Sequence, residues 1–143
     1  MEYLQEIEKF FERNPRFNVV LLKCWESLPQ EQLSGVMDCE VVDLSNLAAV
    51  EPSLIKEIGG YTDLINLITH LVRKTEKERM LIYLDFALTA LDQEKRRYFF
   101  ENVLQRSFPK PLILITHLFS DEVPDTKSQE FNYGKTIEWR SQR

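Results

Sequence analysis

The sequence is poor in the residues that most often build metal sites, phosphate loops and disulfide frameworks. Among its 143 residues are four glycines, two histidines and two cysteines, too few for a metal-ligand cluster of recognisable spacing. Its apolar runs are far shorter than the ~20 residues that a membrane-spanning helix needs. Residues 1–9 are acidic and amphipathic, unlike the basic start and apolar block of a signal peptide. We therefore expect a cytoplasmic protein without a membrane segment, in which Cys24 and Cys39 are reduced and buried.

The overall composition is that of one ordinary globular domain. Hydrophobic residues make up 43% and charged residues 29% of the chain, which lets a chain of this length build one core without metals or disulfides. We expect residues 1–143 to form a single domain. The net charge of −5 argues against a surface devoted to nucleic acid. A local basic patch that binds nucleic acid stays an alternative, with the candidates Lys95, Arg96, Arg97, Arg106, Arg140 and Arg143.

Short apolar segments alternate with segments of helical periodicity along the chain. Strands are expected at residues 17–22, 39–44, 80–84, 112–116 and 135–139, and helices at 2–14, 27–33, 45–58, 61–78 and 91–108. The runs at 80–84 and 112–116 show no polar alternation, which is typical of parallel strands covered on both faces. The pattern therefore predicts a three-layer α/β sandwich around a mostly parallel five-stranded sheet, with residues 135–139 at its edge.

Three local details follow from helix signals. The leading helix should end by Asn14, because the residue before a proline avoids the helical conformation. Thr89 and Asp92 resemble a capping box, so Thr89 is expected to begin the helix at 91–108. His70 lies in the apolar region of the helix at 61–78 and is expected to pack there.

Candidate binding residues stand at the ends of two apolar strands. Ligands of parallel α/β sheets bind beyond the carboxyl ends of the strands, near the point where the strand order reverses. Asp85 follows the strand at 80–84, and Thr116 and His117 end the next strand. These three are the candidate cofactor-binding residues, and Asp85 is the candidate metal ligand. Each also has a structural interpretation, since a strand-end Asp often caps the next turn and a lone histidine is more often structural than a general base.

Three segments resemble the core of a small P-loop NTPase of the RecA or AAA kind. Residues 81–85 (LIYLD) look like a Walker B strand, residues 112–117 (LILITH) look like the sensor strand that follows it, and residues 135–139 (KTIEW) look like the last strand. The resemblance implies that the carboxylate of Asp85 would hold Mg²⁺ through water. It also implies that the polar end of the second segment would touch the γ-phosphate.

The segment where that family carries its phosphate loop departs from the pattern. Residues 22–29 (LKCWESLP) contain no glycine, Pro29 removes an amide donor, and the carboxylate of Glu26 would repel phosphate. Phe86 stands where the usual catalytic glutamate would follow the Walker B aspartate. The tripeptide Gly134-Lys135-Thr136 precedes a strand rather than a helix, so it is not a phosphate loop.

We therefore predict no catalytic residues, and a non-catalytic P-loop NTPase-like subunit that docks on a protein partner within a larger complex. This interpretation requires no cofactor. The alternative is that the chain binds ATP and Mg²⁺. The short length, leading helix and strand–Asp signature also resemble the small P-loop proteins of bacterial phage-exclusion systems, which implies a role in phage defence or DNA transactions. Candidate interface residues, of types enriched in binding hot spots, are Trp25, Trp139, Arg96 and Arg97.

A second interpretation is a receiver-like or nucleotide- and Mg²⁺-responsive regulatory domain. Asp85 and Thr116 end consecutive strands, which resembles the phosphoacceptor Asp and switch Thr of response-regulator receivers. Lys135 lies near the place of the receiver lysine. A receiver also needs an acidic pair after its first strand to bind Mg²⁺, and this chain offers only Glu26 there.

Overall fold

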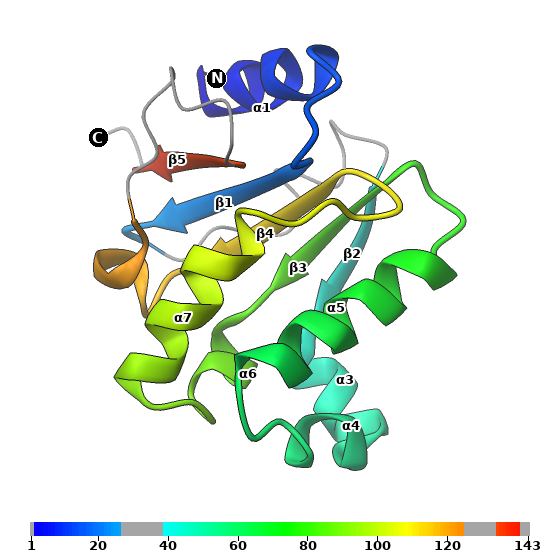
Figure 1. Cartoon of the computed structure of the whole chain (residues 1–143), viewed down its shortest axis with the longest axis vertical. Coiled ribbons are helices and arrows are strands. Elements are labelled where there is room, and N and C mark those ends of the chain that lie inside the picture. Colours follow the sequence, from blue (N-terminus) through cyan, green and yellow to red (C-terminus); the bar gives the residue numbers. More distant parts are fainter. Residues whose placement is uncertain (1, 27–38, 125–133, 141–143) are drawn as a thin grey trace.

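The computed structural model describes residues 2–26, 39–124 and 134–140, and five strands among them form one sheet. The strands lie in the order β2-β3-β4-β1-β5 (Figure 1). Their bounds are β1 Val19–Cys24, β2 Cys39–Asp43, β3 Arg79–Tyr83, β4 Leu112–Thr116 and β5 Lys135–Trp139. The predicted α/β class is confirmed. Every pairing is parallel, including that of the edge strand β5.

Helices cover both faces of the sheet, with α1 on one face and α5 and α7 on the other (Figure 1). The helices are α1 Glu2–Glu12, α3 Leu44–Val50, α4 Pro52–Lys56, α5 Tyr61–Lys74, α6 Asp85–Leu88 and α7 Gln93–Val103, with a 3-10 turn η1 at Ser120–Glu122. Because α3 follows β2 and α6 follows β3, the short helices gather at the carboxyl end of the sheet. In the described part of the chain, no helix combines the length and apolar character needed to cross a bilayer.

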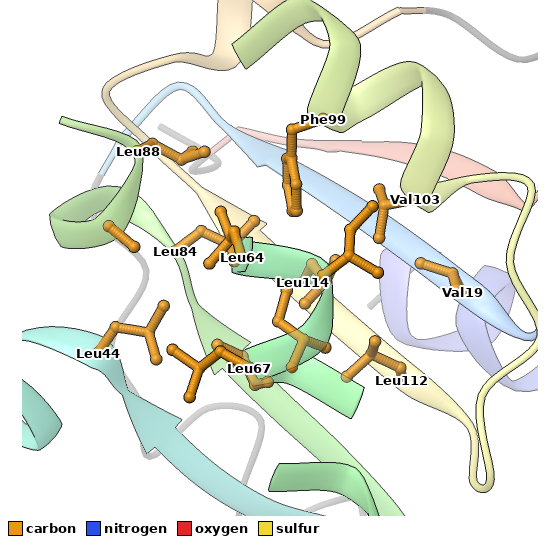
Figure 2. Close-up of a cluster of buried hydrophobic side chains, with 14 of the residues drawn as sticks. Val19, Leu44, Leu64, Leu67, Leu84, Leu88, Phe99, Val103, Leu112 and Leu114 are labelled. Atoms are coloured by element: carbon orange, nitrogen blue, oxygen red, sulfur yellow. The ribbon is translucent and has the colours of Figure 1, made fainter. Parts of the chain in front are cut away.

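The larger hydrophobic core lies between the sheet and the layer of α5 and α7 (Figure 2). Val19 of β1 and Leu114 of β4 pack there with Leu64 of α5 and Phe99 of α7, all fully buried. β4 is buried along its whole length, as its missing polar alternation predicts, whereas β3 is buried in its three central residues and half-buried at both ends. Each large apolar side chain buried in this way contributes about 1.5–3 kcal/mol, so this layer holds the sheet's central strands in place.

The opposite face of the sheet packs against α1. Ile7 belongs to the apolar stripe of α1, which lies on a second cluster of strand side chains. Arg79 of β3 ties the helix to the sheet through two hydrogen bonds to the carboxylate of Glu8. The helix ends at Glu12, and Asn14 has a φ of 52°, the left-handed conformation in which asparagine often closes a helix. The predicted leading helix is confirmed, two residues shorter than expected, with Asn14 in the left-handed conformation just before the proline.

Two predictions about α5 are wrong, and one further predicted helix falls on residues that the structure does not describe. His70 is exposed rather than packed, because it lies about 200° around the helix from the buried Ile68. The helix ends at Lys74. The charged segment up to residue 78, which the sequence predicts as the last turn of this helix, is therefore not helical. The short helix expected at 27–33 lies outside the described residues.

The predicted cap of α7 is also wrong. Thr89 ends the short helix α6, where its hydroxyl donates to the carbonyl of Phe86. Asp92 is the actual N-cap, and its carboxylate accepts a hydrogen bond from the amide of Lys95 at 2.9 Å. Thr89, which the sequence pattern assigned to the start of α7, therefore belongs to the end of α6.

The two cysteines lie at opposite ends of the sheet. Cys24 is the last residue of β1 and Cys39 is the first residue of β2, and both are buried and free. Since β3 and β4 lie between these strands, the strand spacing alone separates them by about 14 Å, beyond the reach of a disulfide. The prediction of two buried thiols is confirmed.

The strand order bears on the receiver-like interpretation. Receivers share the flavodoxin-like order 2-1-3-4-5, in which the first strand lies between the second and third. Here β1 lies between β4 and β5. The sheet therefore does not have the strand order of a receiver, although Asp85 and Thr116 do follow neighbouring strands.

Candidate functional site

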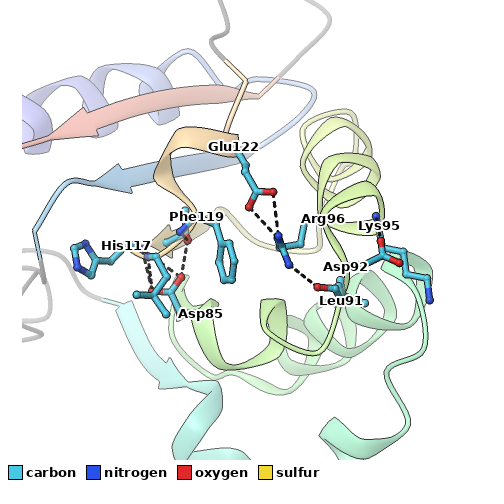
Figure 3. A network of polar contacts seen from close by, with 10 residues as sticks. Asp85, Leu91, Asp92, Lys95, Arg96, His117, Phe119 and Glu122 are labelled. Carbon is cyan, nitrogen blue, oxygen red and sulfur yellow. Dashed lines mark hydrogen bonds and ion pairs between the residues drawn. The ribbon is translucent and has the colours of Figure 1, made fainter.

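Polar groups from the ends of β1, β3 and β4 meet at the carboxyl end of the sheet. These three strands are neighbours, in the order β3-β4-β1, so segments far apart in the sequence end side by side. Asp85 begins α6 directly after β3, and Thr116 is the last residue of β4. The structure thus brings together the three residues predicted from the sequence, Asp85, Thr116 and His117. Figure 3 shows Asp85 beside His117.

The carboxylate of Asp85 is occupied by donors of the chain itself. Its Oδ1 accepts the hydroxyl proton of Thr116 at 2.5 Å, its two oxygens lie 3.2 and 3.0 Å from the amide nitrogen of His117, and its Oδ2 accepts from the amide of Leu118 at 3.0 Å. These contacts use the lone-pair positions of the carboxylate. Asp85 therefore caps the loop that follows β4. Among the described residues, no three His, Cys, Asp or Glu side chains are arranged to hold a metal ion.

His117 and Ser120 close the end of β1. The Nδ1 of His117 lies 2.9 Å from the carbonyl oxygen of Cys24, and the hydroxyl of Ser120 donates to the same oxygen at 2.8 Å. Because a carbonyl oxygen only accepts, Nδ1 carries a proton; in a neutral imidazole with that tautomer, Nε2 is an acceptor. The last carbonyl of β1 is thereby tied to the loop after β4, at the place where the P-loop resemblance would require a phosphate loop to begin.

Arg96 of α7 holds the same loop through Glu122 (Figure 3). Its guanidinium donates to both carboxylate oxygens of Glu122 at 2.8 and 3.2 Å and to the carbonyl of Leu91, and it stacks 4.2 Å from the ring centre of Phe119. The side chains of Arg96 and Glu122 are only 16% and 13% exposed. Arg96, a candidate interface residue from the sequence, therefore sits within the fold as a clamp between α7 and η1.

The other candidate interface residues differ in exposure. Trp25 is 37% exposed, donates from its indole nitrogen to Glu138, and lies under the guanidinium of Arg140 at 4.7 Å. Trp139 is half-buried and meets the ring of Tyr3 edge-on. Trp25 and Arg97, which is exposed on α7, are therefore the two that reach the surface.

The basic candidates for nucleic acid are partly engaged within the chain. Lys95 donates to the carbonyl of Gly59 at 2.9 Å, and Arg140 donates to the carboxylate of Glu138 at 2.7 Å. Arg106 is exposed after α7, and Arg143 lies outside the described residues.

A pocket of about 370 Å³ opens beside Asp85, and its lining includes Asp43, Tyr83, Phe86 and His117. Burial raises the pKa of Tyr83 to about 12, and the neighbouring Cys24 and Asp43 add to the increase. Burial likewise raises the pKa of the Cys24 thiol to about 12, with a further contribution from the charge of Asp85. Neither group is ionised near neutral pH, so this end of the sheet contains no activated thiolate or phenolate.

Sequence reasoning missed two contributors to this region. Asp43 lies at the end of β2 and caps α3, with its Oδ1 accepting from the amide and hydroxyl of Ser45 at 3.0 and 2.7 Å. The rule that singled out Asp85, a carboxylate at a strand end, would also have found Asp43. Ser120 has no such signal, because only the folded loop brings its hydroxyl to the end of β1.

Comparison with known proteins gives no match for this chain among protein-family models, curated proteins or solved structures.

Proposed function

We propose that this chain is a non-hydrolysing P-loop NTPase-like subunit that docks on a protein partner within a larger complex. The observation that carries the proposal is the closure of the end of β1, where His117 and Ser120 both bind the carbonyl of Cys24. A phosphate loop needs a chain of free amides that curls around an anion. Here the loop after β4 occupies the end of that strand instead.

The order of the strands supports the P-loop-like part of the proposal. The resemblance requires the ends of β1, β3 and β4 to face one ligand, as phosphate-loop, Walker B and sensor strands. Those three strands are neighbours in the sheet. The neighbouring position of these strands supports a P-loop-like framework, and the sequence after β1, which lacks glycine, supports the loss of phosphate binding.

The charges at this end of the sheet also support a role other than phosphate binding. Asp43 and Asp85 both line the pocket beside β3, and Glu26 follows β1. A triphosphate placed there would meet carboxylates without a phosphate-binding lysine in a glycine-rich loop. A subunit that has such a framework, and whose described residues offer no glycine-rich phosphate loop, is suited to assembly with partners. Its resemblance to proteins of phage-exclusion systems suggests phage defence or DNA transactions as the setting.

Nucleotide binding and partner binding can be tested on the same preparation. We expect no shift in the thermal unfolding midpoint with millimolar ATP or ADP, with or without Mg²⁺, and no ATP hydrolysis above that of buffer. Because ligand at a hundred times its dissociation constant adds about 2.7 kcal/mol of stability, binding would be visible. We expect a tagged chain purified from its native host, with nuclease treatment, to retain a protein partner in stoichiometric amount.

The opposite results would favour the second candidate function. A Mg²⁺-dependent shift with ATP that disappears in Asp85→Asn would indicate a nucleotide-responsive regulatory domain. Retention of DNA that weakens steeply with salt would indicate nucleic-acid binding. Failure to recover any protein partner would contradict the assembly role.

A further inference from the structure

Two pockets adjoin at the carboxyl end of the sheet, and the first shares His117 with the closure of β1. The first, of about 370 Å³, lies beside Asp85, and the second, of about 520 Å³, lies over α4. Phe86 and Thr89 line both, so the two pockets are adjacent, and we name them together the double pocket. The volume of each is in the range of sites that bind ligands. Phe86 is 46% exposed and Leu118, at the rim of the first pocket, is 62% exposed.

The first pocket offers acceptors. Asp43 uses Oδ1 to cap α3, and its Oδ2 has no partner among the described residues. His117 uses Nδ1 on the carbonyl of Cys24, which leaves Nε2 as an acceptor. Asp85 adds negative charge although its oxygens are occupied by internal donors. The acceptor groups that a ligand can reach in this pocket therefore suit a hydrogen-bond donor that carries positive charge.

The second pocket is mainly apolar. Its lining includes Ala48, Pro52, Ile55 and Ile58, together with the ring of Phe86. Lys56 is the one charged residue among those that line it. The exposed carboxylates of Glu51 and Glu57 lie at the two ends of α4. An apolar side chain placed there would bury apolar surface against Phe86 without leaving a buried polar group unpaired.

We propose that the double pocket is the docking surface for a peptide segment of a protein partner, which places a lysine or arginine in the first pocket and an apolar side chain beside Phe86 in the second. The inference rests on the proposed function and names the partner's recognition chemistry. Lysine and arginine carry donors only, which match the open acceptors of Asp43 and His117. An acidic segment would face Asp43, Asp85 and a chain of net charge −5, so it would be repelled.

Two substitutions and two matched controls test the surface with the tagged full chain in its native host. Asp43→Asn removes the charge and keeps an equally good N-cap, and Asp92→Asn makes the same change at the cap of α7, outside both pockets. Phe86→Ser removes the aromatic anchor, and Val50→Ser removes an apolar side chain that is 78% exposed and lines neither pocket. Unchanged thermal midpoints would show that each variant is folded.

We expect Asp43→Asn and Phe86→Ser to reduce the co-purified partner about tenfold or more, as hot-spot residues do, while both controls retain it. A photo-crosslinking residue at Leu118 should join the chain to a partner segment that contains Lys or Arg near apolar residues. Equal retention by all four variants would overturn the docking surface and leave the proposed function standing. A cross-linked segment without basic residues would overturn the recognition chemistry. Absence of any partner from the wild-type chain would overturn the proposed function and this inference with it.

Discussion

The carboxylate of Asp85 and the hydroxyl of Thr116 are hydrogen-bonded at 2.5 Å across the ends of the neighbouring strands β3 and β4. The same carboxylate accepts from the two amides that follow Thr116. A residue that sequence patterns suggest for Mg²⁺ thereby organises the loop after β4. The first prediction follows from this use of the carboxylate.

Asp85→Ala should destabilise the fold by about 2 kcal/mol, because it leaves amide and hydroxyl donors without their acceptor. Asp85→Asn should cost less, since its amide oxygen can still accept some of these bonds. Urea unfolding measures both changes. Asp121→Asn, an exposed position in the same loop, is the control and should stay within about 0.5 kcal/mol of wild type. Unchanged stability in Asp85→Ala would contradict the capping role.

Arg96 and Arg97 are adjacent in the sequence and should differ sharply in their effect on stability. Arg96→Met leaves Glu122 as a largely desolvated carboxylate without its partner, which should cost about 2–4 kcal/mol. Arg97→Ala removes an exposed guanidinium and should change the free energy of unfolding by less than about 0.5 kcal/mol. Denaturant unfolding of the two variants makes the comparison. Similar small losses in both would mean that the clamp between α7 and η1 is not maintained in solution.

The pair of Glu8 and Arg79 should make the attachment of α1 sensitive to acid. The hydrogen bonds from Arg79 lower the pKa of Glu8, so the pair stabilises the fold above the unfolded pKa of about 4.3. That contribution is lost as the pH falls through the lowered native pKa. Because the Glu8 side chain is 41% exposed, the effect should be only a few tenths of a kcal/mol.

In Glu8→Gln, the unfolding midpoint should therefore depend less on pH below about 4.3 than in the wild type. The stability of this variant at neutral pH should be slightly lower. Glu6→Gln, an exposed change on the same helix, serves as the control. If the two variants follow the same pH profile, the ion pair does not contribute to the attachment of α1.

Cys24 should not react with thiol reagents while the protein is folded. Its side chain is fully buried, and burial raises its pKa to about 12, so the reactive thiolate is scarce. The labelling rate of Cys24 with a chromogenic disulfide should rise with urea in step with unfolding. A Cys39→Ala variant isolates the Cys24 signal. Rapid labelling of that variant in native buffer would show that the end of β1 opens without global unfolding.

Much of the framework follows from the sequence, because local signals and burial agree. The apolar run 112–116 and the alternating run 135–139 form β4 and β5 with the predicted bounds. Both are short segments with clear boundaries, in which strand propensity and burial favour the same structure. The start of α7 is different, since the turn of α6 competes for the same residues and only tertiary packing decides between them.

The candidate site was predictable in position and less so in chemistry. The rule for carboxyl ends of parallel strands locates Asp85, Thr116 and His117. It does not say that the oxygens of Asp85 would be used by the loop after β4, because that loop's conformation depends on contacts such as that of Arg96 with Glu122. Ser120 was not predicted as a site residue for the same reason, since its partner, the carbonyl of Cys24, lies on a distant part of the chain.

Among the glycines in the described residues, Gly134 should be the one least tolerant of substitution by alanine. A Cβ there would lie 2.5 Å from the carbonyl oxygen of Val19, so β5 would have to move away from β1. Such overpacking typically costs 1–3 kcal/mol, and we expect about 2 kcal/mol for Gly134→Ala. At Gly59 the nearest atom to a Cβ is a side-chain oxygen of Asp63 at 3.6 Å, an ordinary contact, so Gly59→Ala should lie within about 0.5 kcal/mol of wild type.

Urea midpoints of the two alanine variants measure this difference, and amide exchange locates it. In Gly134→Ala, the protection of β5 amides should fall more than that of β3, because β5 is an edge strand that pairs with β1 and with no other described strand. This outcome would assign Gly134 to the packing of the last strand, in agreement with the sequence, where Gly134, Lys135 and Thr136 precede a strand and form no phosphate loop. Equal midpoints for both variants would mean that β5 does not approach β1 as closely as the structure describes.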